Sequence, residues 1–355
     1  PGDHIGSFAF SMSDYLTSFM DIPDIILEVN YGSEIPDGNF SLDNFSFKSW
    51  WIRTYALSYS RYIIKNNHNI YSDGPAFLKS LSGGITLKYV ATYAYTDIGL
   101  SADVNYSTAT QTLSGSYDAT AVYSFSQDLQ PLNAFTNQDG APRGFLNLHP
   151  AGKGFGIDLG AGAELQNGFI LGLALTDLGS ISWSGAATES EFEGYIDISG
   201  VIQYEDIDSL SHNISLVSER SNTFNTPLPA ALRLGVALKF QDMFHSFPGE
   251  LLAGIDYNQG LNNQPSNYTN PRFSFGMEYR YKPTWPILIG GYTYDFLGIS
   301  RGAIGLGYKT YFMDVYVSTI DVLSISGETN RFSASLVARW KFFSGEAKKR
   351  GPECY

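Results

Sequence analysis

The sequence has a single cysteine, Cys354, among its 355 residues. Without a second cysteine no internal disulfide is possible, so the fold must be stabilised in another way. No run of 18 or more apolar residues occurs, and this excludes a conventional membrane-spanning helix. The longest apolar stretches, such as residues 169–175, have the length of a strand. Only 16% of the residues are charged, a small share for an acidic soluble protein.

Motifs for catalysis and for metal binding are also lacking. The histidines are isolated from one another and show no HExxH or paired-ligand spacing; they are His4, His68, His149, His212 and His245. No phosphate-binding loop, nucleophile elbow or dinucleotide fingerprint occurs in its required setting. We therefore expect a protein that is not an enzyme, with no catalytic residue, no metal and no cofactor. The net charge of −13, without a basic cluster, argues against a nucleic-acid partner.

A strict alternation of side chains is the main positive signal. In residues 272–282 every second side chain is large and apolar, and those between are charged, hydroxylic or absent. The same pattern recurs in residues 153–165, 231–240 and 331–342, and more weakly in 84–95. A period of two predicts strands with one apolar face and one polar face.

Two architectures fit such strands, a soluble sandwich and a membrane barrel. Soluble strands average about five or six residues, whereas a tilted strand that crosses a bilayer needs roughly nine to eleven, and the alternation here lasts that long. The polar faces are rich in Gly and Ser with scattered charges, as in a wet lumen. The 24 Tyr and 24 Phe are enough for two interfacial aromatic girdles. We predict an all-β, antiparallel transmembrane barrel in the outer membrane of a Gram-negative bacterium, in contact with its lipid; the sandwich is the alternative.

Fifteen segments read as strands, among them the neighbours 81–97 and 99–107. Bacterial barrels have an even number of strands, so we expect about 14, with one segment in a loop or two merged. The barrel is predicted to be one domain over residues 1–343, followed by a periplasmic tail at 344–355. Because the chain starts at Pro1 without a leader pattern, we expect its first residues to lie downstream of a removed signal peptide.

Turn signals separate several of these segments. Asn167-Gly168 is a strong hairpin signal, and Pro283 and Pro286 interrupt two strands. Longer polar connections are expected at 127–152, 204–227 and 259–270.

Residues 15–48 break the alternation near the N-terminus. Pro23 precedes an apolar stretch that ends at Gly32, which predicts a short helix. This insertion is either a hatch folded into the lumen or a surface excursion between two strands.

The polar faces supply the candidate site residues. In residues 49–64, Arg53 and Arg61 share a face with Tyr55 and Tyr59, and we place this face in the lumen because a charge against lipid costs roughly 2–4 kcal/mol. The lumenal ligand-binding candidates are Arg53, Tyr55, Tyr59, Arg61, Lys88, Arg233, Lys239, Glu278, Arg280 and Arg339. Such a lumen would bind an amphipathic molecule by its acidic head and its tail. In the alternative, the charges only pair with Asp158, Glu164 and Asp256 to fill the barrel.

Four segments also carry a family resemblance. Residues 50–60 (WWIRTYALSYS), 83–89 (GGITLKY), 175–183 (LTDLGSISW) and 228–235 (LPAALRLG) resemble the FadL-like outer-membrane barrels, in the branch of the PorV and PorQ type. The likeness extends over residues 49–343.

The resemblance implies a fourteen-stranded barrel and one of two roles. FadL-type members pass small hydrophobic molecules through a lumen plugged by a hatch, whereas PorV-type members are accessory subunits of the type IX secretion system. We accordingly expect a barrel that transports or holds a small hydrophobic or amphipathic ligand. The alternative is a subunit of a larger secretion or cell-surface complex with a plugged lumen. The chain lacks the N-terminal region of the FadL hatch, unless residues 15–48 replace it.

Overall fold

The structure is a computed structural model, and it describes residues 6–21, 37–41, 45–65, 75–107, 109–110, 112–129, 148–199, 214–221, 223–265, 267–295, 300–310, 312–320, 322 and 335–340. These residues form seventeen strands of one sheet, and all of their pairings are antiparallel. The strands are β1 (Ser7–Asp21), β2 (Gly38–Ser41), β3 (Phe45–Lys65), β4 (Leu78–Ser107), β5 (Thr112–Phe125), β6 (Gly152–Leu165), β7 (Phe169–Trp183), β8 (Thr188–Ser199), β9 (Ile214–Ser221), β10 (Phe224–Pro227), β11 (Ala231–Lys239), β12 (Glu250–Gly260), β13 (Arg272–Arg280), β14 (Ile287–Asp295), β15 (Ser300–Lys309), β16 (Met313–Thr319) and β17 (Ser335–Trp340). Helical structure is limited in this part of the chain to η1 (Gln127–Leu129) and α3 (Phe240–Met243), and no described helix is long and apolar enough to cross a membrane.

Twelve of the strands form a continuous row. Its order is β1, β3, β4, β6, β7, β11, β12, β13, β14, β15, β16 and β17. The row is curled. Side chains from β1, β3, β7, β11 and β13 accordingly line one cavity on its concave face. The sheet is not closed: among the described residues, β1 and β17 each pair along one edge only.

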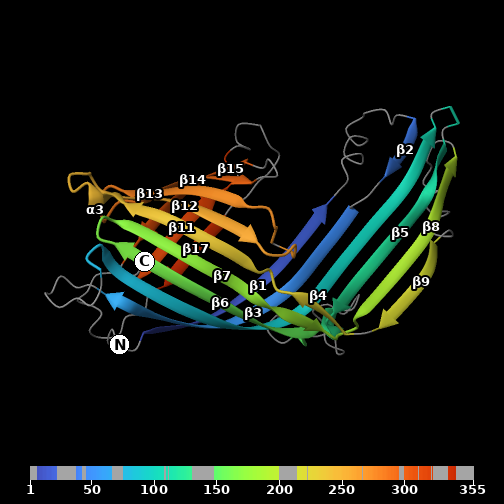
Figure 1. Cartoon of the computed structure of the whole chain (residues 1–355), viewed down its shortest axis with the longest axis horizontal. Helices are drawn as coiled ribbons and strands as arrows, with labels where there is room; N and C mark the ends of the chain where they lie inside the picture. Colours follow the sequence, from blue (N-terminus) through green and yellow to red (C-terminus); the bar gives the residue numbers. More distant parts are fainter. Residues whose placement is uncertain are drawn as a thin grey trace.

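A second branch of the sheet leaves the row at β4. Residues 78–92 of this thirty-residue strand pair with β6, whereas residues 94–107 pair with β5. β5 then pairs with β8, and β8 with β9, while β2 pairs with the far end of β4. We call residues 94–107 of β4, together with β2, β5, β8 and β9, the wing. Figure 1 shows it projecting away from the curled row.

The predicted all-β antiparallel fold is confirmed, with differences in detail. The described strands number seventeen rather than about 14, and the expected strands 81–97 and 99–107 are merged in β4. The insertion expected at 15–48 is smaller, since β1 continues to Asp21 and β3 begins at Phe45. The helix expected between Pro23 and Gly32 lies outside the described residues. The connection expected at 204–227 contains two short strands, β9 and β10.

The two ends of the row differ in their connections. At one end the strands are joined by the predicted Asn167-Gly168 turn, the connection 240–249 and the proline-flanked turn 281–286. Gly168 adopts φ +87°, and its N–H donates to the carbonyl of Leu165 (3.1 Å). β1 begins and β17 ends at this short-turn end. The long connections and the wing lie at the opposite end.

A compact apolar cluster lies where the sheet branches. There Thr92 of β4 pairs with β6, whereas Ala94 pairs with β5. The cluster, which we call the branch core, consists of Trp50, Ile52, Val90, Tyr95, Ala151, Ile181, Trp183 and Leu228. The indole N–H of Trp183 donates to Thr226 Oγ1 (2.8 Å) and is thereby satisfied. The branch core lies on the concave side, and three of its residues line a cavity there.

Candidate functional site

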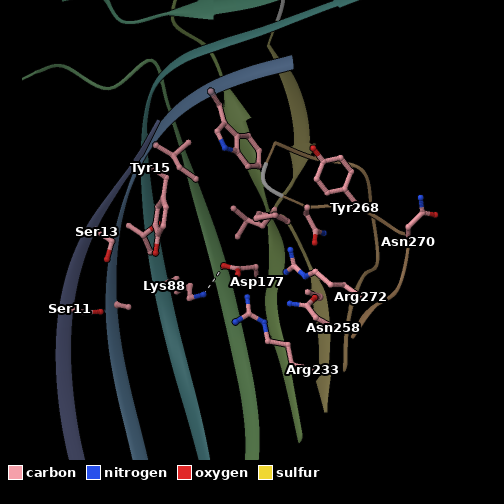
Figure 2. A pocket seen from close by; sticks show the side chains of 18 of the residues that line it. Ser11, Ser13, Tyr15, Lys88, Asp177, Arg233, Asn258, Tyr268, Asn270 and Arg272 are labelled. Atoms are coloured by element: carbon pink, nitrogen blue, oxygen red, sulfur yellow. Dashed lines mark hydrogen bonds and ion pairs between the residues drawn. The ribbon is translucent and has the colours of Figure 1, made fainter. Parts of the chain in front are cut away.

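A cavity of about 240 Å³ lies beside the branch core, and we call it the upper chamber. Trp50, Ile52 and Leu228 of the branch core form its apolar wall. Ser11 and Ser13 of β1 lie beside β3 on one flank of the chamber, and Arg233 of β11 and Arg272 of β13 lie on the other flank. Figure 2 shows these side chains converging from strands that are distant in sequence. The chamber therefore combines an apolar patch with polar side chains on both of its flanks.

Three cationic side chains reach the chamber, Lys88 from β4, Arg233 from β11 and Arg272 from β13 (Figure 2). The chamber also contains two carboxylates, Asp177 and Asp295, so one positive charge is in excess. Lys88 is bound to Asp177, but Arg233 and Arg272 make no ion pair with any described carboxylate. These two guanidinium groups are available to an anion.

The connection between β12 and β13 covers one side of the chamber. Its anchor is the buried Asn267, whose amide donates to the carbonyls of Ala230 (2.8 Å) and Asn262 (3.0 Å). The ring of Tyr268 packs edge-on against Phe19 of β1, with the ring centroids 5.3 Å apart. Partial burial raises the pKa of the Tyr268 phenol, so it remains a hydroxyl that can donate a hydrogen bond. The connection thus spans the space between β12 and β1.

An ion triad lies on the side of the upper chamber that is away from the connection between β12 and β13. Lys88 Nζ is 2.6 Å from Asp177 Oδ1 and 2.8 Å from Asp158 Oδ1. Asp177 has a φ of 57°, rare for a residue other than glycine, and its backbone N–H donates to Asp158 Oδ1 (2.7 Å). The two carboxylates are therefore connected both through Lys88 and through the backbone of Asp177.

A second cavity of about 830 Å³, the lower chamber, occupies the concave face toward the short-turn end. Its wall consists largely of small residues, including Ser58, Ser82, Gly84, Gly160 and Gly162. Glu164 binds Lys239 (2.7 Å) and Lys79 (2.9 Å) in this wall. The small side chains leave a wide, hydrophilic space.

Of the ten predicted site residues, the structure brings Lys88 and Arg233 to the upper chamber, and Tyr59, Arg61 and Lys239 to the border of the lower one. Glu278 binds Lys309 (3.1 Å), Arg280 binds Glu250, and Arg339 lies opposite Asp314 in the β16–β17 register. The predicted pairing is confirmed for Asp158 and Glu164. It is wrong for Asp256, which makes no ion pair with another described residue.

Two predicted residues, Arg53 and Tyr55, lie on the convex face, so their lumenal assignment was wrong. Ile52 and Thr54 line the upper chamber, and the intervening Arg53 points the opposite way. Tyr55 shares the face of Arg53 by alternation. The ring of Tyr59, at the border of the lower chamber, packs on that of Phe8, with the ring centroids 4.9 Å apart.

Arg53 avoids lipid by being covered. Its Nε donates to both carboxylate oxygens of Asp14 at 3.0 Å, and its guanidinium lies 5.2 Å from the ring centroid of Tyr93. Leu129 and Leu148, from the connection between β5 and β6, pack in the cluster that contains Tyr93. The side chain of Arg53 is 0% exposed as a result.

Sequence reasoning missed several residues of the upper chamber. Arg272 stands on the polar face of the predicted strand 272–282 and was detectable by the same parity argument. Asn267 and Tyr268 lie in an irregular connection that has no period to place them. No group of three or more His, Cys, Asp or Glu in the described part of the chain is arranged to hold a metal ion.

Comparison with known proteins gives limited information. Two mutants of the porin of Rhodopseudomonas blastica match the structure at 9% identity, each over 95% of this chain and 100% of the porin chain, with TM-scores of 0.27 and 0.26. No curated protein matches the sequence. Residues 2–319, most of the chain, match DUF5723, described as a family of unknown function, and the chain therefore belongs to that family.

Proposed function

We propose that this protein is a non-enzymatic outer-membrane barrel that holds a small amphipathic anion in its upper chamber and transports it. The observation that carries the proposal is the position of Arg233 and Arg272, which make no ion pair with a described residue, in one chamber with the apolar side chains of Ile52 and Leu228. The expected likeness to FadL-type barrels agrees with this role and stays a prediction.

The convex face supports a membrane location. Leu87, Ile157 and Leu173 lie on it in neighbouring strands and are 54%, 41% and 49% exposed. The band continues through further exposed residues of β11 to β15, namely Leu234, Val236, Ile255, Phe275, Met277, Leu288 and Leu306. A contiguous apolar surface of this extent is typical of contact with lipid rather than water.

Aromatic residues border this band at the short-turn end. Tyr281 and Trp285 pack edge-on in the turn between β13 and β14, with their ring centroids 5.4 Å apart. Both side chains are exposed. This is the arrangement of an interfacial girdle. Because periplasmic turns are short in such barrels, the short-turn end faces the periplasm and the wing faces outward.

The upper chamber suits a small ligand with an acidic head. Charge-assisted hydrogen bonds from Arg233 and Arg272 would hold the head, and the side chains of Ile52 and Leu228 would contact the tail. Its volume of about 240 Å³ lies below the usual range for drug-sized ligands. A short-chain amphipath therefore fits better than a long one.

The arginines give a direct test with octanoate. Each charge-assisted hydrogen bond contributes about 1.5–3 kcal/mol, so Arg233→Ala or Arg272→Ala should weaken binding of octanoate roughly 10- to 100-fold. Titration calorimetry of the detergent-solubilised protein measures this. Arg280→Ala, which removes a paired arginine from the same face, should leave the affinity unchanged. Equal affinity of the wild type for octanoate and octanol, or no binding of either, would refute the ligand assignment.

A second role as an accessory subunit has support of its own. The branch core fills part of the concave side where the sheet branches, and the wing extends beyond the row of strands. Both features suit a barrel that presents a surface to a partner rather than an open pore. Absence of octanoate uptake into liposomes, together with co-purification of a large partner, would favour this role.

The membrane assignment predicts unequal effects at two adjacent positions of β4. Leu87 is exposed on the convex face, whereas Thr86 lines the lower chamber. An arginine facing lipid near the midplane costs roughly 2–4 kcal/mol, so Leu87→Arg should lower the free energy of unfolding by about that amount, and Thr86→Arg by much less. Urea unfolding in lipid vesicles measures both. Equal losses would contradict the assignment of the two faces.

A further inference from the structure

Three polar side chains form one row across the upper chamber. Arg233 of β11 lies opposite Asn258 of β12, and Asn258 lies opposite Arg272 of β13. All three line the chamber, and Figure 2 shows Asn258 between the two arginines. Because adjacent strands are about 4.8 Å apart, the row spans roughly 10 Å at the backbone. Two guanidinium groups and one amide are thus within reach of a single small group.

The side chains of this row have no partners in the described part of the chain. Arg233, Asn258 and Arg272 make no ion pair and no side-chain hydrogen bond with a described residue. Asp295 lies opposite Arg272 in the β13–β14 register, yet the two side chains do not pair. The ion pairs described above join many other charged side chains of the concave face. Two like charges are therefore held close together without a described counterion, an arrangement that a bound anion stabilises.

We propose that the head group held in the upper chamber is a phosphate monoester rather than a carboxylate. A phosphate monoester has three terminal oxygens that are strong acceptors, whereas a carboxylate has two oxygens. Arg233 and Arg272 would donate to two of the phosphate oxygens through their guanidinium forks. The side-chain amide of Asn258 would donate to the third. This inference rests on the proposed function, because it specifies the ligand of the same chamber.

The neighbours of the row determine where the head group lies. The carboxylate of Asp295 follows beyond Arg272 in the row, and it repels an anion at that end. At the other end, Ala174 of β7 lies opposite Arg233 and has no side-chain donor. The head group is therefore placed over Asn258, between the two arginines.

Octyl phosphate and octanoate test the head group, because their chains are of similar length. Titration calorimetry of the detergent-solubilised protein at pH 8 measures both affinities. An additional charge-assisted hydrogen bond raises an affinity about 10-fold or more, so the wild type should bind octyl phosphate at least about 10-fold more tightly than octanoate. Equal or weaker binding of octyl phosphate, with octanoate still bound, would overturn this inference and leave the proposed function intact. If neither ligand binds, both fail.

The variant Asn258→Leu tests the third donor. It should weaken binding of octyl phosphate about 10-fold and that of octanoate less than about twofold, because the two carboxylate oxygens are already bound by the arginines. Ser274→Ala is the control. It removes a hydroxyl that lies two residues from Arg272 on the same face of β13 and bonds to Thr293 (3.1 Å), and it should change neither affinity. Unchanged binding of octyl phosphate by the Asn258→Leu variant would overturn the role assigned to Asn258.

Two further probes distinguish the possible sources of the phosphate. Inorganic phosphate has the head group without a chain, and dioleoyl phosphatidic acid has it on two long chains. Both should bind at least about 10-fold more weakly than octyl phosphate, because the chamber offers Ile52 and Leu228 to a chain and, at about 240 Å³, has room for one short chain only. Equally tight binding of inorganic phosphate, or of the two-chain lipid, would contradict a short-chain phosphate ester as the ligand.

Discussion

Replacing Arg53 with alanine is expected to destabilise the protein by about 3–5 kcal/mol, the usual loss when one partner of a buried ion pair is removed. Arg53 is inaccessible to solvent and binds Asp14 through two contacts of 3.0 Å. Without it, the Asp14 carboxylate loses its counterion. The cluster of Tyr93 and Leu148 also loses the guanidinium group that packs on the Tyr93 ring. Urea unfolding in vesicles measures the change.

Two comparisons identify the cause of the loss. Arg61→Ala removes an exposed arginine from the same strand and the same face, and it should cost less than about 0.5 kcal/mol. Arg53→Met combined with Asp14→Leu removes both charges and keeps the volume, so most of the stability should return. A loss that is as large in the double variant as in Arg53→Ala would mean that packing, not the ion pair, matters.

The row of strands is expected to close in the membrane by pairing of β1 with β17. An unpaired strand edge in hydrocarbon costs several kcal/mol for each unsatisfied backbone group, and β1 alone has fifteen residues. β1 runs away from the short-turn end and β17 runs toward it, so the two can pair antiparallel. The twelve strands of the row then make an even-numbered barrel.

Cysteine pairs locate this seam. Ser335, Val337 and Arg339 face the concave side of β17, as Ala9, Ser11 and Ser13 do in β1. Each double variant has one cysteine at one of the three β17 positions and one at one of the three β1 positions. Because residues opposite each other in paired strands share a face, at least one of these double variants should form a disulfide within the chain. Met12, on the convex side, should form none with the same three positions. Crosslinks only between two chains would instead show that another copy pairs with β1.

Alternation predicted much of the fold because it is a local property. The strands 153–165, 231–240 and 272–282 correspond to β6, β11 and β13, and their polar faces contribute Arg233 and Arg272 to the upper chamber. The merging of two expected strands into β4 was not predictable in the same way. Apolar side chains recur at every odd position from Ile85 to Tyr95, across the point where β4 changes its partner from β6 to β5, and that change depends on contacts distant in sequence.

The errors at the site have a common physical origin. The rule that a charge faces the lumen failed for Arg53 because residues 75 to 95 positions later cover it. Parity likewise gave no reason for Asp177 to face inward, since a bulge reverses the alternation there. Residues such as Asn267 are placed by side-chain hydrogen bonds to the backbone of another segment, which a linear pattern does not encode.

The length of β4 makes it a mechanical link across the molecule. Lys88 and Ser107, at the tip of the wing, belong to one strand and are separated by roughly 60 Å at 3.3 Å per residue. Hydrogen-bonded neighbours along both edges resist bending or slippage of that strand. A force that displaces the tip of the wing is therefore transmitted along this strand toward Lys88, through the single register shift opposite Trp51 and Ile52.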